Sequence, residues 1–293
     1  MTNNLLIIID GSYCLYRTYY SIVSVNKNLG ESSGAIYGVL NIISYLLTKY
    51  KPSHIVITFD KGGKTFRNNL YNNYKCNRSP MPDNLRKQIT PLKKLIKAIG
   101  ISTISITGVE GDDIIGTIAL STINYDINVI IVSNDKDMAQ LVSDKIKLLV
   151  KISGNVLGPN EIKDKFGVSP NLIIDYLALV GDRIDNIPGV PGIGVKTARL
   201  LLNKLGNLKL LYSHLDKINS SEFYRAKKII SNLLLYRDNA FLSYKLATIK
   251  TNVPIKYSYR DFMLKQSKLR FLSNILKQYN LYYFTNKLKF INF

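Results

Sequence analysis

Three short apolar runs in this chain each lead into acidic residues, and this pattern constrains the fold more than any other feature of the sequence. The runs span residues 5–9, 54–59 and 128–133. Continuous runs of this kind are typical of strands buried on both faces of a parallel sheet. Asp10, Asp60 and the pair Asp135 and Asp137 follow them. Because parallel strands end at the same edge of a sheet, we expect these carboxylates to gather there.

Helical spacing of apolar residues separates the predicted strands. The helical segments are residues 34–50, 83–99 and 114–123. A weaker strand is expected at 102–107, and the alternation predicts an α/β region with a mostly parallel central sheet flanked by helices. This region spans residues 1–160. From residue 161 to 293 the pattern is mainly helical, with Gly and Pro residues clustered at 187–194. We therefore expect two regions of different class.

The charge balance points to polyanions as the partner class. The chain of 293 residues has 40 Lys and Arg against 20 Asp and Glu, a formal net charge of +20. Such a surplus binds phosphates almost regardless of sequence, although a compositional bias towards Ile, Asn, Lys and Tyr offers a second explanation. No apolar run reaches the ~18 residues of a membrane span, and no secretory signal is recognisable. Cys14 and Cys76 lack metal-ligand spacing, so we expect a cytoplasmic protein.

Nine of the 20 acidic residues are candidates for one site. Besides those at strand ends, Glu110, Asp112 and Asp113 begin a predicted helix, and Asp182 and Asp185 precede the Gly/Pro cluster. Taken singly, each of these acidic residues can also be explained as a helix cap or a loop carboxylate. As a set they repel, since like charges about 4 Å apart cost about 4 kcal/mol at an effective dielectric near 20. The set therefore predicts divalent cations, and neutralising Asp112 or Asp113 is expected to stabilise the metal-free protein.

The motifs of several other reaction types are absent from the sequence. The chain has no Gly-x-x-x-x-Gly-Lys-Ser/Thr loop and no Gly-x-Gly-x-x-Gly turn after the first strand. An aspartyl nucleophile of the phosphatase type requires Asp-x-Asp, whereas the sequence has Asp10 followed by Gly and Ser. His54 begins a predicted strand and His214 lies in the helical region, so both are interpreted as structural. The reaction that these exclusions leave is attack of activated water on a phosphodiester, assisted by two metal ions.

The Gly/Pro cluster predicts a phosphate-binding turn between two helices. Gly189, Gly192 and Gly194 let backbone N–H groups turn outward beside a helix N-terminus, and Lys196 adds a positive charge. Contacts of this kind hold phosphates without reading bases, so binding is expected to be independent of sequence. A plain turn remains the alternative.

A basic and aromatic stretch follows Asp60 at residues 61–86. Tyrosines there can stack on unpaired bases while Lys75 and Arg78 hold phosphates. We also expect Lys64 and Arg67 to contact nucleic acid. The alternative is an ordinary solvated helix, but the position directly after a candidate metal ligand favours binding.

Together these motifs resemble a known family. They are 9–12 (Ile-Asp-Gly-Ser) with 15–17 (Leu-Tyr-Arg), 58–60 (Thr-Phe-Asp) with 63–67 (Gly-Lys-Thr-Phe-Arg), 74–82, 108–113 (Gly-Val-Glu-Gly-Asp-Asp), 135–141, 179–192 and 244–250 (Tyr-Lys-Leu-Ala-Thr-Ile-Lys). The sequence is similar to the 5'-3' exonuclease domain of bacterial DNA polymerase I, in the flap endonuclease superfamily. The motifs occur in order along nearly the whole chain.

The resemblance implies two divalent ions, Mg²⁺ or Mn²⁺. It assigns the ligands of the first ion, directly or through water, to Asp10, Asp60, Glu110, Asp112 and Asp113. It assigns those of the second to Asp135, Asp137, Asp182 and Asp185. The fold it implies is PIN-like.

The resemblance also implies how DNA is held. A helical arch at about residues 62–90 would carry Lys75 and Arg78 at its base, where they steer the scissile phosphate. Tyr74 would stack near the scissile nucleotide, and Arg17 would contact a nearby phosphate. A helix-turn-helix element at about residues 175–206 would grip the duplex, commonly with a monovalent cation such as K⁺.

Two departures from the family pattern stand out. Arg183 and Ile184 replace the usual small residues between the last two carboxylates, which puts the affinity of the second metal site in question. The chain ends at Phe293 without a polymerase region. We therefore expect a stand-alone, monomeric nuclease that works with a separate DNA polymerase and a ligase.

The expected activity is hydrolysis from the 5' side of duplex DNA and cleavage of 5' flaps, including RNA primers on DNA. The expected roles are lagging-strand maturation and excision repair. Two alternatives stay open: a catalytically silent, structure-specific DNA-binding protein, and an α/β endoribonuclease that needs only four acidic residues.

Overall fold

A parallel sheet forms the centre of the α/β region. The computed structural model describes residues 4–24, 33–219, 223–265, 269–279, 281 and 283–284. Within them, the sheet has five strands in the order β3-β2-β1-β4-β5, all parallel. Their bounds are β1 Leu5–Asp10, β2 His54–Thr58, β3 Ser102–Ile104, β4 Asn128–Val132 and β5 Ile146–Leu149. The central β1 is fully buried, as expected for a strand covered on both faces.

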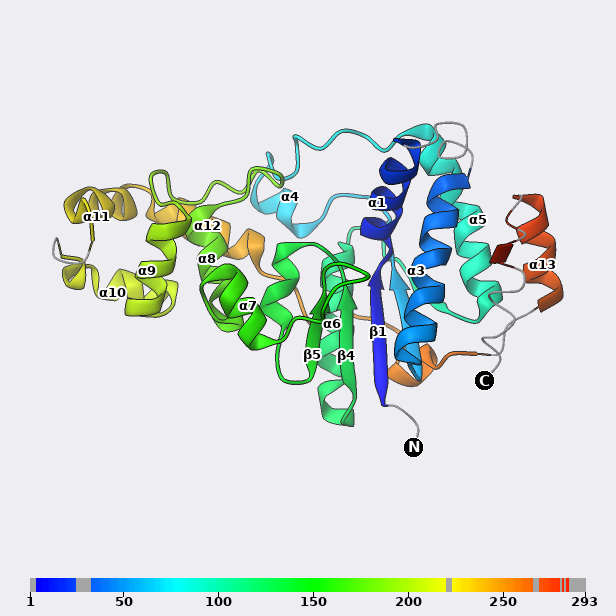
Figure 1. The fold of residues 1–293 in the computed structure, drawn as a ribbon. Coiled ribbons are helices and arrows are strands. Elements are labelled where there is room, and N and C mark those ends of the chain that lie inside the picture. Colours follow the sequence, from blue (N-terminus) through cyan, green and yellow to red (C-terminus); the bar gives the residue numbers. More distant parts are fainter. Residues whose placement is uncertain are drawn as a thin grey trace.

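Alternate residues of β1 pack into two separate hydrophobic cores, one on each face of the sheet. Ile7 and Ile9 face the core shared with α1, α3, α5 and α13, whereas Leu6 and Ile8 face the core shared with α6 (Figure 1). The alternation follows from the two-residue period of a strand. The helix bounds are α1 Gly11–Val23, α3 Ala35–Tyr50, α5 Asp83–Ile99, α6 Gly111–Ser121 and α13 Leu269–Gln278. The α/β region is therefore a three-layer structure.

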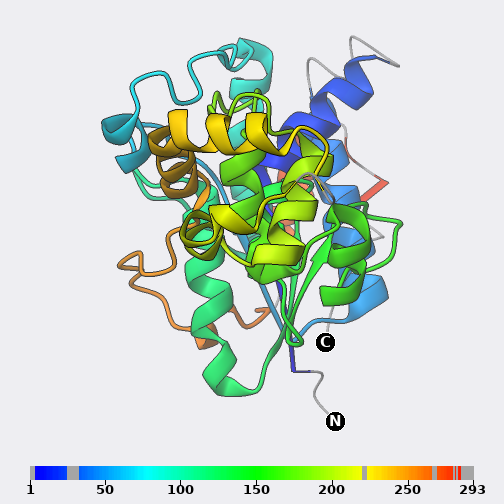
Figure 2. The same ribbon diagram turned by 90° about the vertical axis from the view of Figure 1, so that its left-hand side faces the viewer.

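The core on the α6 side of the sheet extends into the helical region. In it α8 packs on α9 and α12, and α12 also contacts α4; Figure 2 views the molecule from this side. The helix bounds are α4 Phe66–Leu70, α7 Pro159–Phe166, α8 Ile173–Val180, α9 Val195–Leu205, α10 Leu208–Ser213, α11 Ala226–Leu235 and α12 Arg237–Ala247. Short 3₁₀ turns are η2 Ile123–Tyr125, η3 Lys136–Leu141, η4 Pro170–Leu172, η5 Leu215–Lys217 and η6 Tyr259–Phe262. No helix in the described part of the chain has the length and apolar character needed to cross a membrane.

The predicted fold class is confirmed. The strands expected from apolar runs correspond to β1, β2 and β4, and the helix predicted at residues 83–99 is α5. The apolar pattern does not predict the strand β5, because it is only four residues long and Lys147 interrupts its apolar character. Within the predicted arch at 62–90, only α4 and the start of α5 are α-helical, and turns occupy residues 72–77.

Candidate active site

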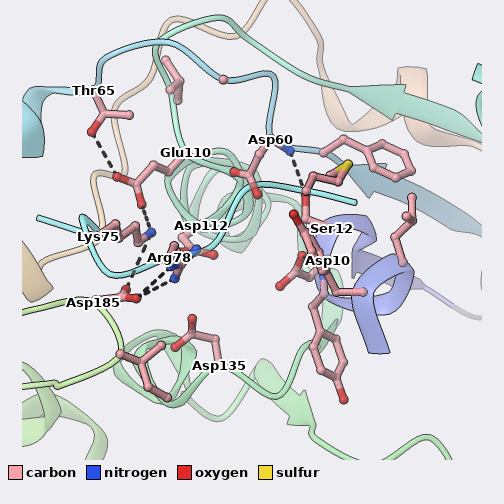
Figure 3. Close-up of a pocket in the computed structure, with 18 of the residues that line it drawn as sticks. Asp10, Ser12, Asp60, Thr65, Lys75, Arg78, Glu110, Asp112, Asp135 and Asp185 are labelled. Atoms are coloured by element: carbon pink, nitrogen blue, oxygen red, sulfur yellow. Dashed lines mark hydrogen bonds and ion pairs between the residues drawn. The ribbon is translucent and has the colours of Figure 1, made fainter. Parts of the chain in front are cut away.

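A cavity of about 650 Å³ opens where β1, β2 and β4 end (Figure 3). Seven of the nine predicted carboxylates line it. They are Asp10, Asp60, Glu110, Asp112, Asp135, Asp182 and Asp185. Lys75, Arg78 and Lys136 line the same cavity. The sheet and its flanking loops thus bring together residues that are up to 175 positions apart, from Asp10 to Asp185.

The end of β1 holds Asp10 in a fixed orientation. Asp10 is the N-cap of α1, and its Oδ1 accepts the N–H of Tyr13 at 2.9 Å. Its Oδ2 accepts the Ser133 hydroxyl at 2.9 Å. The helix begins at Gly11, where an added Cβ would lie 2.6 Å from the Thr58 carbonyl oxygen. Only glycine therefore lets α1 start so close to β2.

Asp60 links the end of β2 to the start of α6. Its backbone N–H donates to the Ser12 hydroxyl at 2.9 Å, and its Oδ1 accepts the Gly111 N–H at 2.7 Å. Glu110 is the N-cap residue of α6, and Asp112 lies in the first turn. An anionic side chain is favoured at this position because the first N–H groups of a helix carry partial positive charge.

Glu110 is surrounded by donors. Its Oε1 accepts the Thr65 hydroxyl at 3.1 Å and lies 3.3 Å from Arg67 Nη1. Its Oε2 accepts the Tyr74 hydroxyl at 3.1 Å and the Lys75 ammonium. Burial raises the pKa of Glu110, but the attraction of Lys75 and Arg67 outweighs it, and the net shift is downward. Glu110 is therefore an ionised, strongly oriented carboxylate.

The second group of carboxylates is also paired with cations. Asp185 Oδ1 accepts Arg78 Nη2 at 2.6 Å, and Asp185 Oδ2 lies 3.7 Å from Lys75 Nζ. Asp182 Oδ2 lies 3.1 Å from Lys136 Nζ. Positively charged side chains thus compensate part of the negative charge of the cavity wall.

Lys75 has an unusual backbone. Its φ of 56° lies in the left-handed region, which is uncommon for residues other than glycine. Its N–H donates to the Asp185 carbonyl oxygen at 2.9 Å, which ties the turn to the Asp182–Asp185 loop. Strained backbone of this kind concentrates at functional sites, where surrounding contacts hold it.

The acidic wall has more negative charge than its cations neutralise. Burial raises the pKa of Asp10 to about 7, with smaller contributions from Asp60 and Asp135. The pKa values of Asp112 and Asp137 are raised well above the usual range by burial and then by the nearby Asp135. Such carboxylates favour either a proton or a bound cation.

The donor set fits hard divalent cations, which prefer carboxylate oxygens. Asp137 does not line the cavity, but its Oδ1 is buried without a hydrogen-bond partner in the described part of the chain. Yet no three acidic, cysteine or histidine side chains among the described residues stand close enough together to hold one ion. Lys75 and Arg78 contact Glu110 and Asp185 instead. Metal binding therefore requires side-chain rotation away from these cations.

Asp113 and Arg67 do not occupy their predicted places. The Arg67 guanidinium is 2% exposed and binds both carboxylate oxygens of Asp113, at 2.9 and 2.8 Å. It therefore has no free face for DNA, and the predicted DNA contact of Arg67 is wrong. Asp113 lies outside the cavity wall, and its carboxylate is committed to this ion pair. Its role as a metal ligand stays a prediction, and it would require this ion pair to open.

Two further residues are less exposed than the sequence indicates. Tyr74 lines the cavity but is 5% exposed, and its hydroxyl donates to Glu110; its stacking on a nucleotide stays a prediction. The N–H of Gly189 donates to the buried Ser243 hydroxyl at 2.9 Å and does not turn outward. Gly189 serves the fold instead, because an added Cβ would lie 2.5 Å from the backbone nitrogen of Gly181.

The other predicted DNA contacts lie on the surface. These exposed residues are Arg17, Lys64, Gly192, Gly194 and Lys196. Gly194 is the N-cap of α9, and Lys196 lies in its first turn. Of the two departures in the Asp182–Asp185 loop, Arg183 is exposed, and Ile184 is 74% exposed and lines the cavity.

The sequence did not single out the apolar wall of the cavity. Tyr13 and Tyr16 of α1 line it together with Met81 and Ile89. The signal was present, since positions three and six after Asp10 fall on the first two turns of a helix that starts at the strand end. The lining of the cavity thus combines carboxylates with aromatic and aliphatic side chains.

Residues 5–270 match two consecutive domain models of 5'-3' exonucleases. Residues 5–167 match "5'-3' exonuclease, N-terminal resolvase-like domain", and residues 168–270 match "5'-3' exonuclease, C-terminal SAM fold". The chain belongs to the 5'-3' exonuclease family. The predicted resemblance is confirmed, and so is the expectation of a nuclease.

Relatives share this similarity over most of the chain. A 5'-3' exonuclease of Buchnera aphidicola subsp. Schizaphis graminum is 46% identical over 94% of this chain and 96% of its own length. DNA polymerase I of Pseudomonas aeruginosa is 46% identical over 85% of this chain, which corresponds to 28% of that protein.

Solved structures share the fold. The T5 5'-exonuclease, solved with zinc ions, superimposes with a TM-score of 0.69 and 21% identity over 98% of this chain and 99% of its own. The catalytic core of Rad2, solved with DNA substrate, gives a TM-score of 0.66 and 18% identity, with 98% and 90% covered.

Proposed function

We propose that this chain is a metal-dependent, structure-specific nuclease that hydrolyses phosphodiesters from the 5' side of duplex DNA and cleaves 5' flaps. RNA primers on a DNA template are included among its substrates. The observation that carries the proposal is the single cavity in which seven carboxylates face Lys75 and Arg78. An acidic wall opposite phosphate-binding cations is suited to a phosphodiester held at bound metal ions.

The carboxylates divide into two groups in this proposal. Asp10, Asp60, Glu110 and Asp112 would hold one Mg²⁺ or Mn²⁺ ion. The other would be held by Asp135, Asp137, Asp182 and Asp185. When bound, the two ions supply Lewis-acid activation of water and stabilise charge on the phosphodiester oxygens.

The chain's own cations and rings orient the substrate. Lys75 contacts a carboxylate of each group, Glu110 and Asp185, and Arg78 contacts Asp185. Once rotated off these carboxylates, the two cations would hold the scissile phosphate. Tyr16 lines the same cavity and offers a ring against which a nucleobase can stack. Arg17 and Lys64 would contact flanking phosphates.

The turn between α8 and α9 would hold the duplex. Gly192, Gly194 and Lys196 are exposed at the N-terminus of α9, where backbone N–H groups favour anions. A K⁺ ion shared with the phosphate backbone is part of this proposal. Because such contacts do not read bases, the enzyme would recognise structure and not sequence.

A flap-cleavage assay tests the proposal. A duplex with a 5'-labelled flap is incubated with the purified protein, with Mg²⁺ and with EDTA. We expect labelled 5' products only with Mg²⁺, and we expect Asp135→Asn to abolish them. The matched control is Asp144→Asn, which removes an exposed carboxylate outside the cavity and should cleave normally.

Other outcomes identify the alternatives. Tight flap binding without cleavage under any metal condition would indicate a silent DNA-binding protein. Faster cleavage of free single-stranded RNA than of flapped DNA would indicate an endoribonuclease. The cellular roles in lagging-strand maturation and excision repair, with a separate polymerase and ligase, follow only from the flap-cleavage result.

A further inference from the structure

The motif at residues 244–250 has no part in the proposed chemistry, although it belongs to the family pattern. Its second half comprises the last two residues of α12 and the three residues that follow, and it lies beside three segments that carry the site. We call residues 246–250 the strap. In Figure 1 the chain leaves α12 and runs back past α6 towards the far end of the sheet. The strap's backbone groups face α4, α6 and η3.

Arg67 joins the strap to α4 and α6. Its Nε donates to the Leu246 carbonyl at 2.8 Å, and its Nη2 donates to the Thr248 carbonyl at 2.8 Å. The same guanidinium holds both oxygens of Asp113. The N–H of Lys250 donates to Asp113 Oδ1 at 2.8 Å, so the carboxylate is bound from two sides. A planar fork is suited to such a set of fixed acceptors.

The strap is connected in two ways to the first carboxylate group, which contains Glu110 and Asp112. Arg67 Nη1 and the Thr65 hydroxyl both approach Glu110 Oε1. Asp113 follows Asp112 on α6, and adjacent helix residues point about 100° apart. Because the strap holds Asp113, the rotation of α6 that turns Asp112 towards the cavity is fixed.

Gln140 joins the strap to the second carboxylate group. Its Nε2 donates to the Ala247 carbonyl at 2.9 Å, and its Oε1 accepts the Ile249 N–H at 2.9 Å. Gln140 belongs to η3, whose N-cap is Asp135 and whose first turn contains Asp137. The same five-residue segment therefore holds both walls of the site.

We propose that the strap is a positioning element that sets the spacing between the two carboxylate groups, with Arg67 and Gln140 as its positioning residues. Neither residue lines the cavity. The inference rests on the proposed metal-dependent function. Partners that orient ligands typically change metal affinity 10- to 100-fold when lost, because misplaced ligands no longer converge.

The test compares metal binding in four variants. Arg67→Gln removes the charge and the fork, Arg67→Lys keeps the charge, and Gln140→Met keeps the length while losing both hydrogen bonds. Tyr212→Phe is the matched control, since it removes a hydroxyl bond to the Leu233 carbonyl in the same helical region, away from the site. Mn²⁺ binding is measured by calorimetry without DNA, with each protein at the same interval below its melting temperature.

We expect Arg67→Gln and Gln140→Met to weaken Mn²⁺ binding about 10- to 100-fold. The Mn²⁺ concentration for half-maximal flap cleavage should rise in parallel, while affinity for flapped DNA in EDTA stays unchanged. Arg67→Lys should recover part of the Mn²⁺ affinity, and Tyr212→Phe should match the wild type. A merely structural role would lower the melting temperature without moving Mn²⁺ affinity.

Each failure has its own meaning. Wild-type Mn²⁺ affinity in folded Arg67→Gln and Gln140→Met would overturn the positioning role. If Arg67→Gln does not fold, Gln140→Met decides, because its loss is two neutral hydrogen bonds. If the wild type binds Mn²⁺ but cleaves no flap, the proposed function fails, and the calorimetric comparison still decides the inference.

Discussion

Asp112 and Asp113 are neighbours on α6, yet they lie in opposite electrostatic environments. Asp113 is buried with a full set of partners, the Arg67 fork and the Lys250 N–H. Asp112 faces the cavity among other carboxylates, and burial together with Asp135 raises its pKa. Buried charge is stable where its partners are part of the fold. Charge left without partners is available for a ligand, at a cost to the metal-free protein.

The largest expected effect comes from breaking the satisfied pair. Asp113→Asn leaves the buried Arg67 with Glu110 as its remaining charged partner and should lower the free energy of unfolding by up to about 3–5 kcal/mol. Urea unfolding in EDTA measures this. The expectation from sequence was stabilisation, and the ion pair reverses its sign. Unchanged stability would mean that Arg67 finds other partners.

Metal ions should bind the cavity carboxylates such as Asp112 and not the paired Asp113. An ion that binds the folded state alone stabilises it by about 2.7 kcal/mol at 100 times its dissociation constant. We therefore expect Mg²⁺ or Mn²⁺ to raise the melting temperature of the wild type. The double variant Asp112→Asn, Asp135→Asn should not respond. An equal rise in wild type and double variant would place the ions elsewhere.

Neutralising Asp112 should have the opposite sign to Asp113. Like charges a few ångströms apart repel by several kcal/mol at most, so we expect Asp112→Asn to stabilise the metal-free protein by about 1–2 kcal/mol. The pKa of Asp112 is higher in the folded protein than in the unfolded chain, where it is near 4. Ionisation of Asp112 therefore lowers the stability of the folded protein as the pH rises above about 4. The advantage of Asp112→Asn should therefore be absent at pH 4 and grow towards pH 8. Chemical unfolding at both pH values checks this, and a constant difference would contradict it.

The smallest expected effect contrasts two basic residues of one segment. Lys64 is exposed, whereas Arg67 is buried. Lys64→Ala should leave stability unchanged and reduce the slope of log DNA affinity against log salt concentration by about 0.9, the loss of one phosphate contact. Binding titrations in EDTA at several salt concentrations measure the slope. An unchanged slope would remove Lys64 from the DNA surface.

The sequence predicts the acidic edge well because the information is local. Each of Asp10, Asp60 and Asp135 follows a recognisable buried strand, and parallel topology then brings them together. The same reasoning places α5 at its observed bounds, whereas it predicts α6 from residue 114 and the helix begins at Gly111.

The misassigned residues all depend on distant partners. Arg67 resembles a DNA contact until the carbonyls of Leu246 and Thr248 surround it. The hydrogen bond from the buried Tyr74 hydroxyl to Glu110 is likewise not visible in the sequence. A charge or ring in a basic stretch has the same appearance in sequence whether it faces solvent or a partner 180 residues away. Asp112 and Asp113 are likewise indistinguishable until the strap is in place.

The strand order has a consequence for how the enzyme comes into being. In the sheet Leu6 pairs with His54, 48 positions along the chain, and Leu5 pairs with Asn128, 123 positions along. Closing such long loops is slow, because chain entropy is lost before the strand contacts form. The carboxylates meet only after these strands pair, and the strap at 246–250 arrives later still during synthesis. A nascent chain on the ribosome therefore cannot assemble the complete acidic cavity until Asp185 has emerged.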